Sequence, residues 1–492
     1  MKDLKQRTIR GGIAKVSAQA TTFLLRVGSL MVLARLLDPK DFGLVGMVTA
    51  AIGMLNLFRD FGLSTAAVQR SAVTDEQIST LFWINMLVGV MLALVSVAIA
   101  PLLAAFYHQP SLVWVTSILA AGFVFNAAGV QHSTLLQREM RFTTLSLIDI
   151  VSQVVSTAVG IGMALKGYGY WALVAMALLA PLTGTICLWL STSWIPGKPR
   201  GRVGIRSMLS FGGMVTLDGL VMYVAYNLEK VLLGRYWGAA AIGIYGRAYQ
   251  LSNIPTDNLN SSVGGVAFSA LSRLQDEPHR FKRFFLKSYS LVLALTLPIT
   301  IVCALFAGDA VTVLLGPKWK EAVPIFRLLA PTILCFAMIN PFSWLLFSLG
   351  LVTRSLKIAL VIAPLVISGY LIGLPYGPKG VALGYSVAMT LWILPNIAWC
   401  IRGTEISFRD VMLTLVRPLM AGVMATVLPL AMLLSYGRLL SPLARLSLGV
   451  TVFGAIYVLI LLYVMGQKEF YMDIVRGLKA RPSVEAKGLV AV

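Results

Sequence analysis

The stretch LARLLDPKDFGLVG occupies residues 33–46, and the stretch LGRYWGAAAIGIYG occupies residues 233–246. Both begin with Leu-x-Arg, and both continue, seven positions after the arginine, with apolar-Gly-apolar-x-Gly. The two stretches align without a gap. A repeat of this kind indicates a chain built from two homologous halves, which is a common organisation among transporters.

Two weaker matches follow in the same order along each half. They pair residues 67–70 (AVQR) with residues 270–273 (ALSR), and residues 169–173 (GYWAL) with residues 380–383 (GVAL). Three ordered matches extend the repeat over about six helical segments per half. Because six is an even number, the two halves should face the same side of a membrane and be related by an axis along its normal.

The composition requires a lipid environment. The 492 residues are 58% hydrophobic and only 12% charged, whereas a soluble domain carries about 25% charged residues. The net charge of +21 would suggest nucleic acid in a soluble protein. Here cytoplasmic loops facing anionic headgroups explain it better, so nucleic acid is not an expected partner. Four cysteines and three scattered histidines form no metal or catalytic pattern, so we expect no metal, cofactor or catalytic group.

The fold class predicted is an all-α integral membrane protein with about 14 transmembrane helices. A spanning helix needs about 20 mostly apolar residues. Such segments run over residues 10–37, 41–61, 79–106, 111–136, 143–165, 168–192, 207–234, 239–270, 284–314, 321–349, 353–375, 379–401, 408–435 and 443–465.

The repeat divides these helices into regions. We expect an N-terminal lobe at 1–193, a cytoplasmic linker at 194–205, a C-terminal lobe at 206–403, two additional helices at 404–466 and a tail at 467–492. Alternate loops are rich in Lys and Arg, which predicts a multi-pass membrane protein with both termini in the cytoplasm.

Polar residues recur at helical spacing inside several apolar segments. Steps of three and four place them on single helix faces, where intramembrane charge usually faces a cavity or a partner. We interpret one set as a substrate-binding cavity for an anionic group: Lys15, Arg26, Arg59, Lys230, Arg247, Gln250 and Asn253. A second set could couple transport to an ion: Asp149, Asp218 and Asp257, with Pro255 expected to break the helix beside the last. Interhelical hydrogen bonds and ion pairs remain the alternative for both sets.

Several segments resemble a known family. Residues 34–45 (ARLLDPKDFGLV), 60–70 (DFGLSTAAVQR), 136–142 (LQREMRF), 246–251 (GRAYQL) and 316–324 (GPKWKEAVP) are similar to motifs of the bacterial polysaccharide exporters. These belong to the multidrug/oligosaccharidyl-lipid/polysaccharide (MOP) superfamily. The resemblance covers about residues 5–405 and is nearest to the colanic-acid exporter type.

The resemblance implies a flippase that moves oligosaccharide repeat units, linked to undecaprenyl diphosphate, from the cytoplasmic to the periplasmic leaflet by alternating access. It implies cavity cations in the helices that contain Lys15, Arg26, Arg59 and Arg247 as the diphosphate-binding groups. Membrane lipid, a polysaccharide polymerase and sugar transferases would be its partners. The alternatives are a multidrug cation antiporter of the same superfamily, a membrane polymerase or ligase, and a scaffold for sugar transferases.

Overall fold

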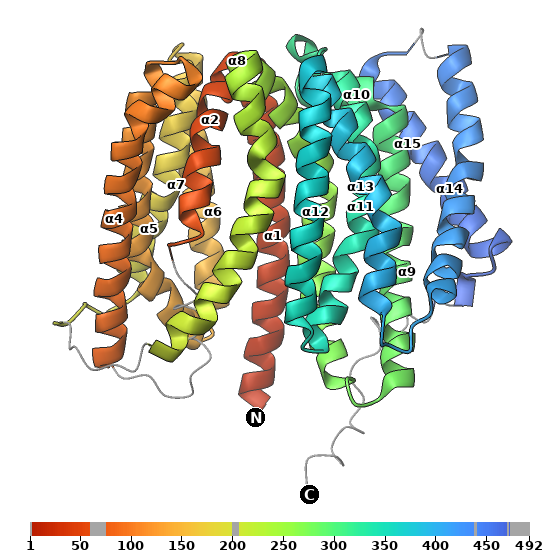
Figure 1. The fold of residues 1–492 in the computed structure, drawn as a ribbon, viewed down its shortest axis with the longest axis horizontal. Helices are drawn as coiled ribbons and strands as arrows, with labels where there is room; N and C mark the ends of the chain where they lie inside the picture. Colours follow the sequence, from red (N-terminus) through yellow and green to blue (C-terminus); the bar gives the residue numbers. More distant parts are fainter. Residues whose placement is uncertain (1, 60–74, 199–205, 437–439, 470–471, 473–492) are drawn as a thin grey trace, which may run out of the picture. The chain divides into compact units, whose positions relative to one another are not determined.

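The computed structural model describes residues 2–59, 75–198, 206–436, 440–469 and 472, with the side chains of 2–18, 206–218, 257–262, 265–266 and 436 left out. This part of the chain is helical and contains no strand (Figure 1). Within it, nine helical stretches are long and apolar enough to cross a membrane. The prediction of an all-α membrane fold is confirmed.

The helices follow the order of the apolar segments. Their bounds are α1 Lys2–Leu36, α2 Pro39–Asn56, α4 Asp75–Tyr107, α5 Ser111–Arg138, α6 Phe142–Leu165, α7 Tyr170–Ser191, α8 Arg206–Arg273, α9 Pro278–Leu305, α10 Ala307–Leu314, α11 Ala322–Ser348, α12 Val352–Gly373, α13 Gly377–Ile401, α14 Phe408–Tyr436 and α15 Pro442–Leu459.

Two boundaries differ from the sequence prediction. The two segments expected at 207–234 and 239–270 are confirmed as the two helical halves of α8, which meet at Gly238, where φ is +80° and ψ is −177°. The segment expected at 284–314 is divided into α9 and α10. Helix α2 ends at Asn56 instead of 61, because Leu57, Phe58 and Arg59 bond to carbonyls three residues earlier, as in a turn.

The expected helix break at Pro255 is wrong. Gly238 is the position in α8 with non-helical backbone angles, and the helix continues through Pro255. A proline inside a helix removes one backbone donor, but neighbouring hydroxyl groups can bond to nearby carbonyls instead. Here the Thr256 hydroxyl donates to the carbonyl oxygen of Asn253 at 2.9 Å.

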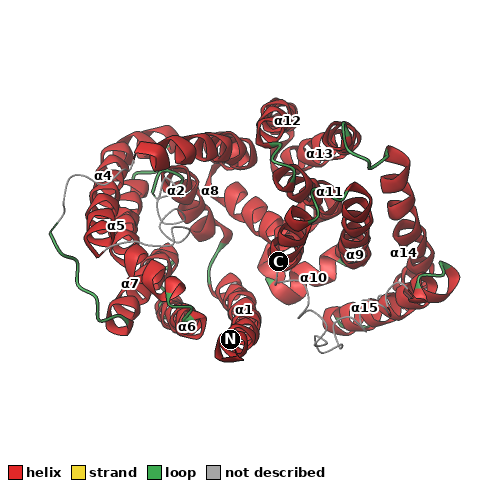
Figure 2. Cartoon of the chain, turned by 90° about the horizontal axis from the view of Figure 1, so that it is seen from below, coloured by secondary structure: helices red, strands yellow, loops and turns green. Residues whose placement is uncertain are grey.

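The described helices form two compact units. The first contains Met1–Tyr249, Leu314–Ile325 and Leu356–Ala388, and the second contains Gln250–Val313, Phe326–Ser355 and Met389–Val492. In the first unit α4 packs on α5, α6 on α7, α5 on α7 and α1 on α6 (Figures 1 and 2). Short connections place successive helices antiparallel and adjacent.

The repeat appears in the first unit as a pair of reciprocal contacts. A Cβ on Gly43 of α2 would lie 1.7 Å from the carbonyl oxygen of Ala239 in α8. A Cβ on Gly243 of α8 would lie 1.8 Å from the carbonyl oxygen of Pro39 in α2. The residues of one contact are those of the other shifted by 200 positions. The conserved spacing of the repeat therefore places small residues where two backbones approach closely.

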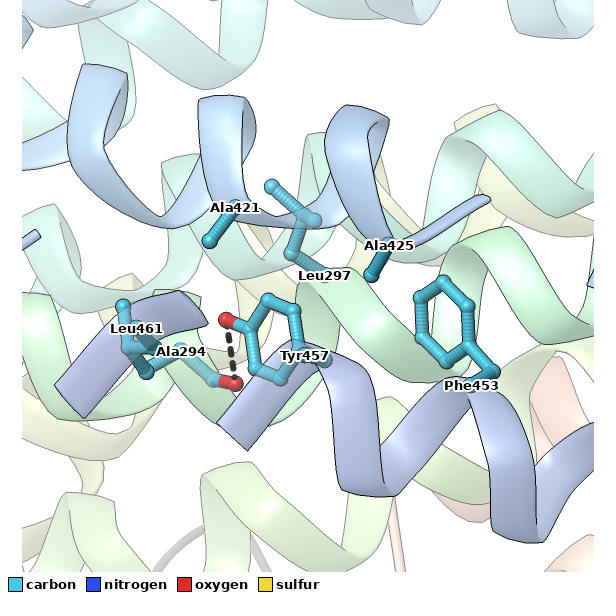
Figure 3. Close-up of a cluster of buried hydrophobic side chains, with 7 residues drawn as sticks. All are labelled: Ala294, Leu297, Ala421, Ala425, Phe453, Tyr457 and Leu461. Atoms are coloured by element: carbon cyan, nitrogen blue, oxygen red, sulfur yellow. Dashed lines mark hydrogen bonds between the residues drawn. The ribbon is translucent and has the colours of Figure 1, made fainter. Parts of the chain in front are cut away.

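The last two helices pack on α9 in the second unit. Ala294 and Leu297 of α9, Ala421 and Ala425 of α14, and residues of α15 form one buried cluster (Figure 3). The Tyr457 hydroxyl donates to the Ala294 carbonyl oxygen at 3.0 Å. Alanines at steps of four leave a groove in α14 that the larger side chains fill. The remaining members of the cluster are Phe453, Tyr457 and Leu461.

Candidate functional site

Arg26 and Asp149 lie on neighbouring helices of the first unit. Helix α1, which contains Arg26, packs against α6, which contains Asp149. Both side chains are exposed in the structure, and the positive charge of Arg26 acts electrostatically on the Asp149 carboxylate. A polar face therefore runs along this helix pair. Other polar side chains of α6 bond to their own helix, for example Ser152 to the carbonyl of Ile148 at 2.7 Å.

Lys230 is half-buried in α8 among polar and aromatic groups. Its Nζ donates to Oδ1 of Asn227 at 2.6 Å and lies 6.0 Å from the centroid of the Tyr249 ring. Asn227 in turn donates to the carbonyl of Tyr223 at 3.0 Å. An ammonium group has three donors, so these contacts orient the cation and still allow an anionic oxygen to bind.

Arg247 is held against α2 by an aromatic ring. Its guanidinium carbon lies 4.3 Å from the centroid of Phe42, within the range of a cation–π interaction. Phe42 is adjacent to Gly43, and Arg247 lies four residues, about one helical turn, after Gly243. Stacking on Phe42 fixes the plane of the guanidinium, which suits paired hydrogen bonds to phosphate oxygens.

The remaining predicted residues are dispersed. Arg59 follows the end of α2 and is half-buried, and its Nε has no hydrogen-bond partner in the described part of the chain. Gln250 is exposed and Asn253 half-buried, and both belong to the second unit. The side chains of the other three predicted residues lie outside the described part of the structure: Lys15, Asp218 and Asp257.

Repeat-related contacts also lie where α1 meets α2. Lys318 binds Asp38 at 2.9 Å, and the Trp319 indole donates to the Ala34 carbonyl at 2.8 Å. In the other half, Arg235 lies 2.9 Å from Nδ1 of His108. Arg35 lies beside the loop that follows α10, and Arg235, its equivalent in the repeat, lies beside the loop that follows α4.

A buried polar cluster contains a residue outside the predicted sets. Glu229, next to Lys230, is 0% exposed, and both its carboxyl oxygens lack a hydrogen-bond partner among the described residues. The signal in the sequence is a carboxylate in an apolar helix with tyrosines three and six residues before it. Sequence reasoning placed Glu229 in neither predicted set and considered it only as the ion-pair partner of a nearby cation.

Comparison with known proteins decides the family. The model of the polysaccharide biosynthesis protein family matches residues 32–324, more than half of the chain. The chain belongs to this family. The resemblance inferred from sequence motifs is therefore confirmed.

Curated relatives agree with this membership. The chain is 27% identical over 395 residues to the lipopolysaccharide biosynthesis protein WzxC of Escherichia coli (strain K12), covering 78% of each protein. It is 31% identical to the teichuronic acid biosynthesis protein TuaB of Bacillus subtilis (strain 168), covering 59% of this chain and 61% of TuaB. It is 26% identical to the succinoglycan biosynthesis transport protein ExoT of Rhizobium meliloti (strain 1021), covering 64% of each.

Solved structures show the same fold at low identity. The lipid II flippase MurJ in an inward closed conformation matches with a TM-score of 0.73 at 14% identity, covering 94% of this chain and all of MurJ. A multidrug resistance MATE family transporter of the MOP superfamily, facing inward, matches with a TM-score of 0.65 at 13% identity, covering 79% of this chain and 97% of the transporter. At these identities the comparison shows that this chain shares its fold with MurJ and with the MATE transporter.

Proposed function

We propose that this protein is a flippase for polysaccharide repeat units linked to undecaprenyl diphosphate. It takes them from the cytoplasmic leaflet and releases them in the periplasmic leaflet by alternating access. Family membership supports the polysaccharide pathway, and the fold shared with MurJ supports a lipid-linked substrate. The observation that carries the proposal is the pair of cations Lys230 and Arg247, which lie in the two halves of α8 on either side of Gly238, each with its side chain oriented by a neighbouring group.

The cations would stabilise the charged head group of the substrate while it crosses the membrane. A diphosphate and its sugars cannot cross about 30 Å of hydrocarbon without a polar path. Arg26, Arg59 and Lys15 would add to Lys230 and Arg247 as diphosphate-binding groups, and Gln250 and Asn253 would bind sugar hydroxyls. The prenyl tail stays in the surrounding lipid. The two repeats act as lobes that alternate around this path.

Transport outward is favoured by the membrane potential. Moving one negative charge out of a cell that is negative inside releases about 2.3 kcal/mol per 100 mV, and a diphosphate carries roughly two such charges. Coupling to an ion adds to this driving force, with Asp149, Asp218 and Asp257 as its candidate carboxylates. Both termini lie in the cytoplasm, where sugar transferases supply the repeat unit. A polymerase consumes it outside.

The multidrug antiporter is the weaker alternative. The fold does not discriminate between a flippase and a drug antiporter, since the MATE transporter shares it. The family match is to polysaccharide biosynthesis proteins, and the cavity side chains that motivate the proposal are cationic, which disfavours a cationic drug.

Lipid mass spectrometry tests the function. Deleting the gene should trap undecaprenyl diphosphate that carries a complete repeat unit, and surface polysaccharide should be lost. A plasmid copy of the gene should reverse both effects. If lipid-linked intermediates and surface polysaccharide are unchanged in the deletion strain, the proposed substrate is wrong.

A further inference from the structure

The first unit buries an acid without a counter-ion in contact. Glu229 of α8 is fully buried, and neither carboxyl oxygen has a hydrogen-bond partner in the described residues. The other deeply buried acid of the described chain, Asp309, shows the usual solution: Arg445 binds its Oδ1 at 2.6 Å. An unpaired buried carboxylate destabilises the folded protein by several kcal/mol. The burial of Glu229 without an ion pair therefore needs another explanation.

The groups around Glu229 are tyrosines from three helices. The carboxyl group acts electrostatically on the hydroxyls of Tyr223, Tyr245 and Tyr370. Adjacent tyrosine rings have centroid separations of 5.5 to 6.4 Å. The hydroxyls of Tyr245 and Tyr370 are buried and lack a hydrogen-bond partner among the described residues. The titratable groups that interact with the acid are Tyr223, Lys230 and Tyr245 of α8 and Tyr370 of α12. Tyr226 and Tyr249 of α8 and Tyr385 of α13 continue the row of aromatic rings.

Lys230 does not neutralise the acid by direct contact. Neighbouring residues of a helix point about 100° apart, so their side chains do not face each other. The Lys230 ammonium instead bonds to Asn227 and lies over the Tyr249 ring. No ion pair between Lys230 and Glu229 is formed in the described residues. Binding a proton would make the carboxyl neutral and so remove the cost of burying an unpaired charge.

The cluster suits a proton better than a metal ion. Hard cations take six or more oxygen ligands, and acidic side chains usually provide several of them. The described residues contain no group of three or more His, Cys, Asp or Glu side chains that could hold a metal ion. One carboxyl among phenols can bind one proton without further ligands.

We propose that Glu229 is a proton-binding site that couples this transporter to the proton gradient, which rests on the flippase function proposed above. When α8, α12 and α13 pack around it, Glu229 holds its proton as a neutral acid. When these helices move apart and water enters, the carboxyl O–H bond breaks, the proton passes to water, and the carboxylate remains hydrated. Because Lys230 is adjacent to Glu229 in the chain, the charge on Glu229 changes the field at this proposed diphosphate-binding cation.

Glu229→Gln separates proton binding from packing. Glutamine keeps the shape and neutrality of the protonated acid but cannot release a proton. If Glu229 served only in packing, this variant would export at the wild-type rate. Proton coupling predicts a folded protein whose export is at least tenfold slower and no longer responds to external pH. Glu277→Gln is the matched control, since it makes the same change at an exposed acid paired with Arg280 and should leave export and its pH response intact.

Infrared difference spectroscopy gives a readout that needs no substrate. Purified wild-type protein in lipid, moved between mildly acidic and mildly alkaline buffer, should show a protonated-carboxyl band that Glu229→Gln removes. If glutamine prevents folding, Glu229→Asp should shift that band instead. An unchanged band in the folded Gln variant, or in the Asp variant, overturns the proposal, as does wild-type export with a wild-type pH profile.

The two proposals fail separately. The infrared titration can contradict the proton site while the trapped lipid intermediate still supports the flippase. Normal lipid intermediates after gene deletion contradict the flippase whatever the infrared result.

Discussion

Replacing Gly243 by alanine should disrupt the crossing of α2 and α8. The new Cβ would lie 1.8 Å from the Pro39 carbonyl oxygen, 2.7 Å from its carbon and 3.2 Å from the backbone nitrogen of Gly43. All three are backbone atoms, so no side chain can rotate away. The helices must separate by about 1.5 Å to restore an ordinary contact, and overpacking of this kind costs about 1–3 kcal/mol.

The separation also weakens other contacts of the crossing. Arg247 would move away from the Phe42 ring, and the reciprocal contact of Gly43 with Ala239 would open. We therefore expect a loss near the upper end, about 3 kcal/mol, which lowers the folded-to-unfolded ratio roughly 100-fold.

Gly246→Ala is the matched control. Gly246 lies in the same helix three residues later, and a Cβ there meets nothing within 4 Å. Alanine in an open helical position is favourable by about 0.5–1 kcal/mol relative to glycine. The two variants change the same residue type in the same element, so their difference isolates the contact with Pro39.

The assay is thermal unfolding of the purified variants in lipid nanodiscs, followed by tryptophan fluorescence. Gly243→Ala and Gly43→Ala should unfold at clearly lower temperature than wild type, and Gly246→Ala at the same or higher temperature. Equal unfolding temperatures for Gly243→Ala and Gly246→Ala would refute the close crossing.

Three further changes test other contacts. Arg26→Ala should slow export about 10- to 100-fold, the worth of one charge-assisted phosphate contact, at normal protein level on an immunoblot; wild-type export removes Arg26 from the site. Asp309→Asn should destabilise the second unit by about 3 kcal/mol, because Arg445 loses its counter-ion; an unchanged unfolding temperature contradicts this. Tyr457→Phe should cost about 1 kcal/mol through the lost bond to Ala294, measured in the same assay, while retained stability assigns the residue to packing alone.

The sequence was sufficient to place most residues of the candidate site on helices, but it could not predict which groups they contact. The three- and four-residue steps put Lys230 and Arg247 in two polar stretches, and they lie in the two halves of α8, before and after Gly238, as expected. Their partners, Asn227 and the Phe42 ring, could not be read from spacing. Spacing shows which residues share a helix face, whereas contacts depend on how the helix is rotated against its neighbours.

Proline and glycine illustrate the same division. Pro255 suggested a break by its local chemistry, yet α8 continues through it. Gly238 lies between two segments that the sequence predicted as separate helices, and the structure shows a positive φ there. The repeat glycines Gly43 and Gly243 were recognised as a pattern, and the structure supplies their reason.

The sequence by itself determined the membrane class, the order of the helices and the two-fold repeat. These follow from local properties, since about 20 apolar residues suffice to define a span and a fixed offset suffices to define a repeat. Only the tertiary structure decided that Gly43 and Gly243 contact each other's helices and that Glu229 is buried without a partner. Both depend on side chains brought together from distant segments, because packing selects one rotation for each helix and leaves some polar groups enclosed.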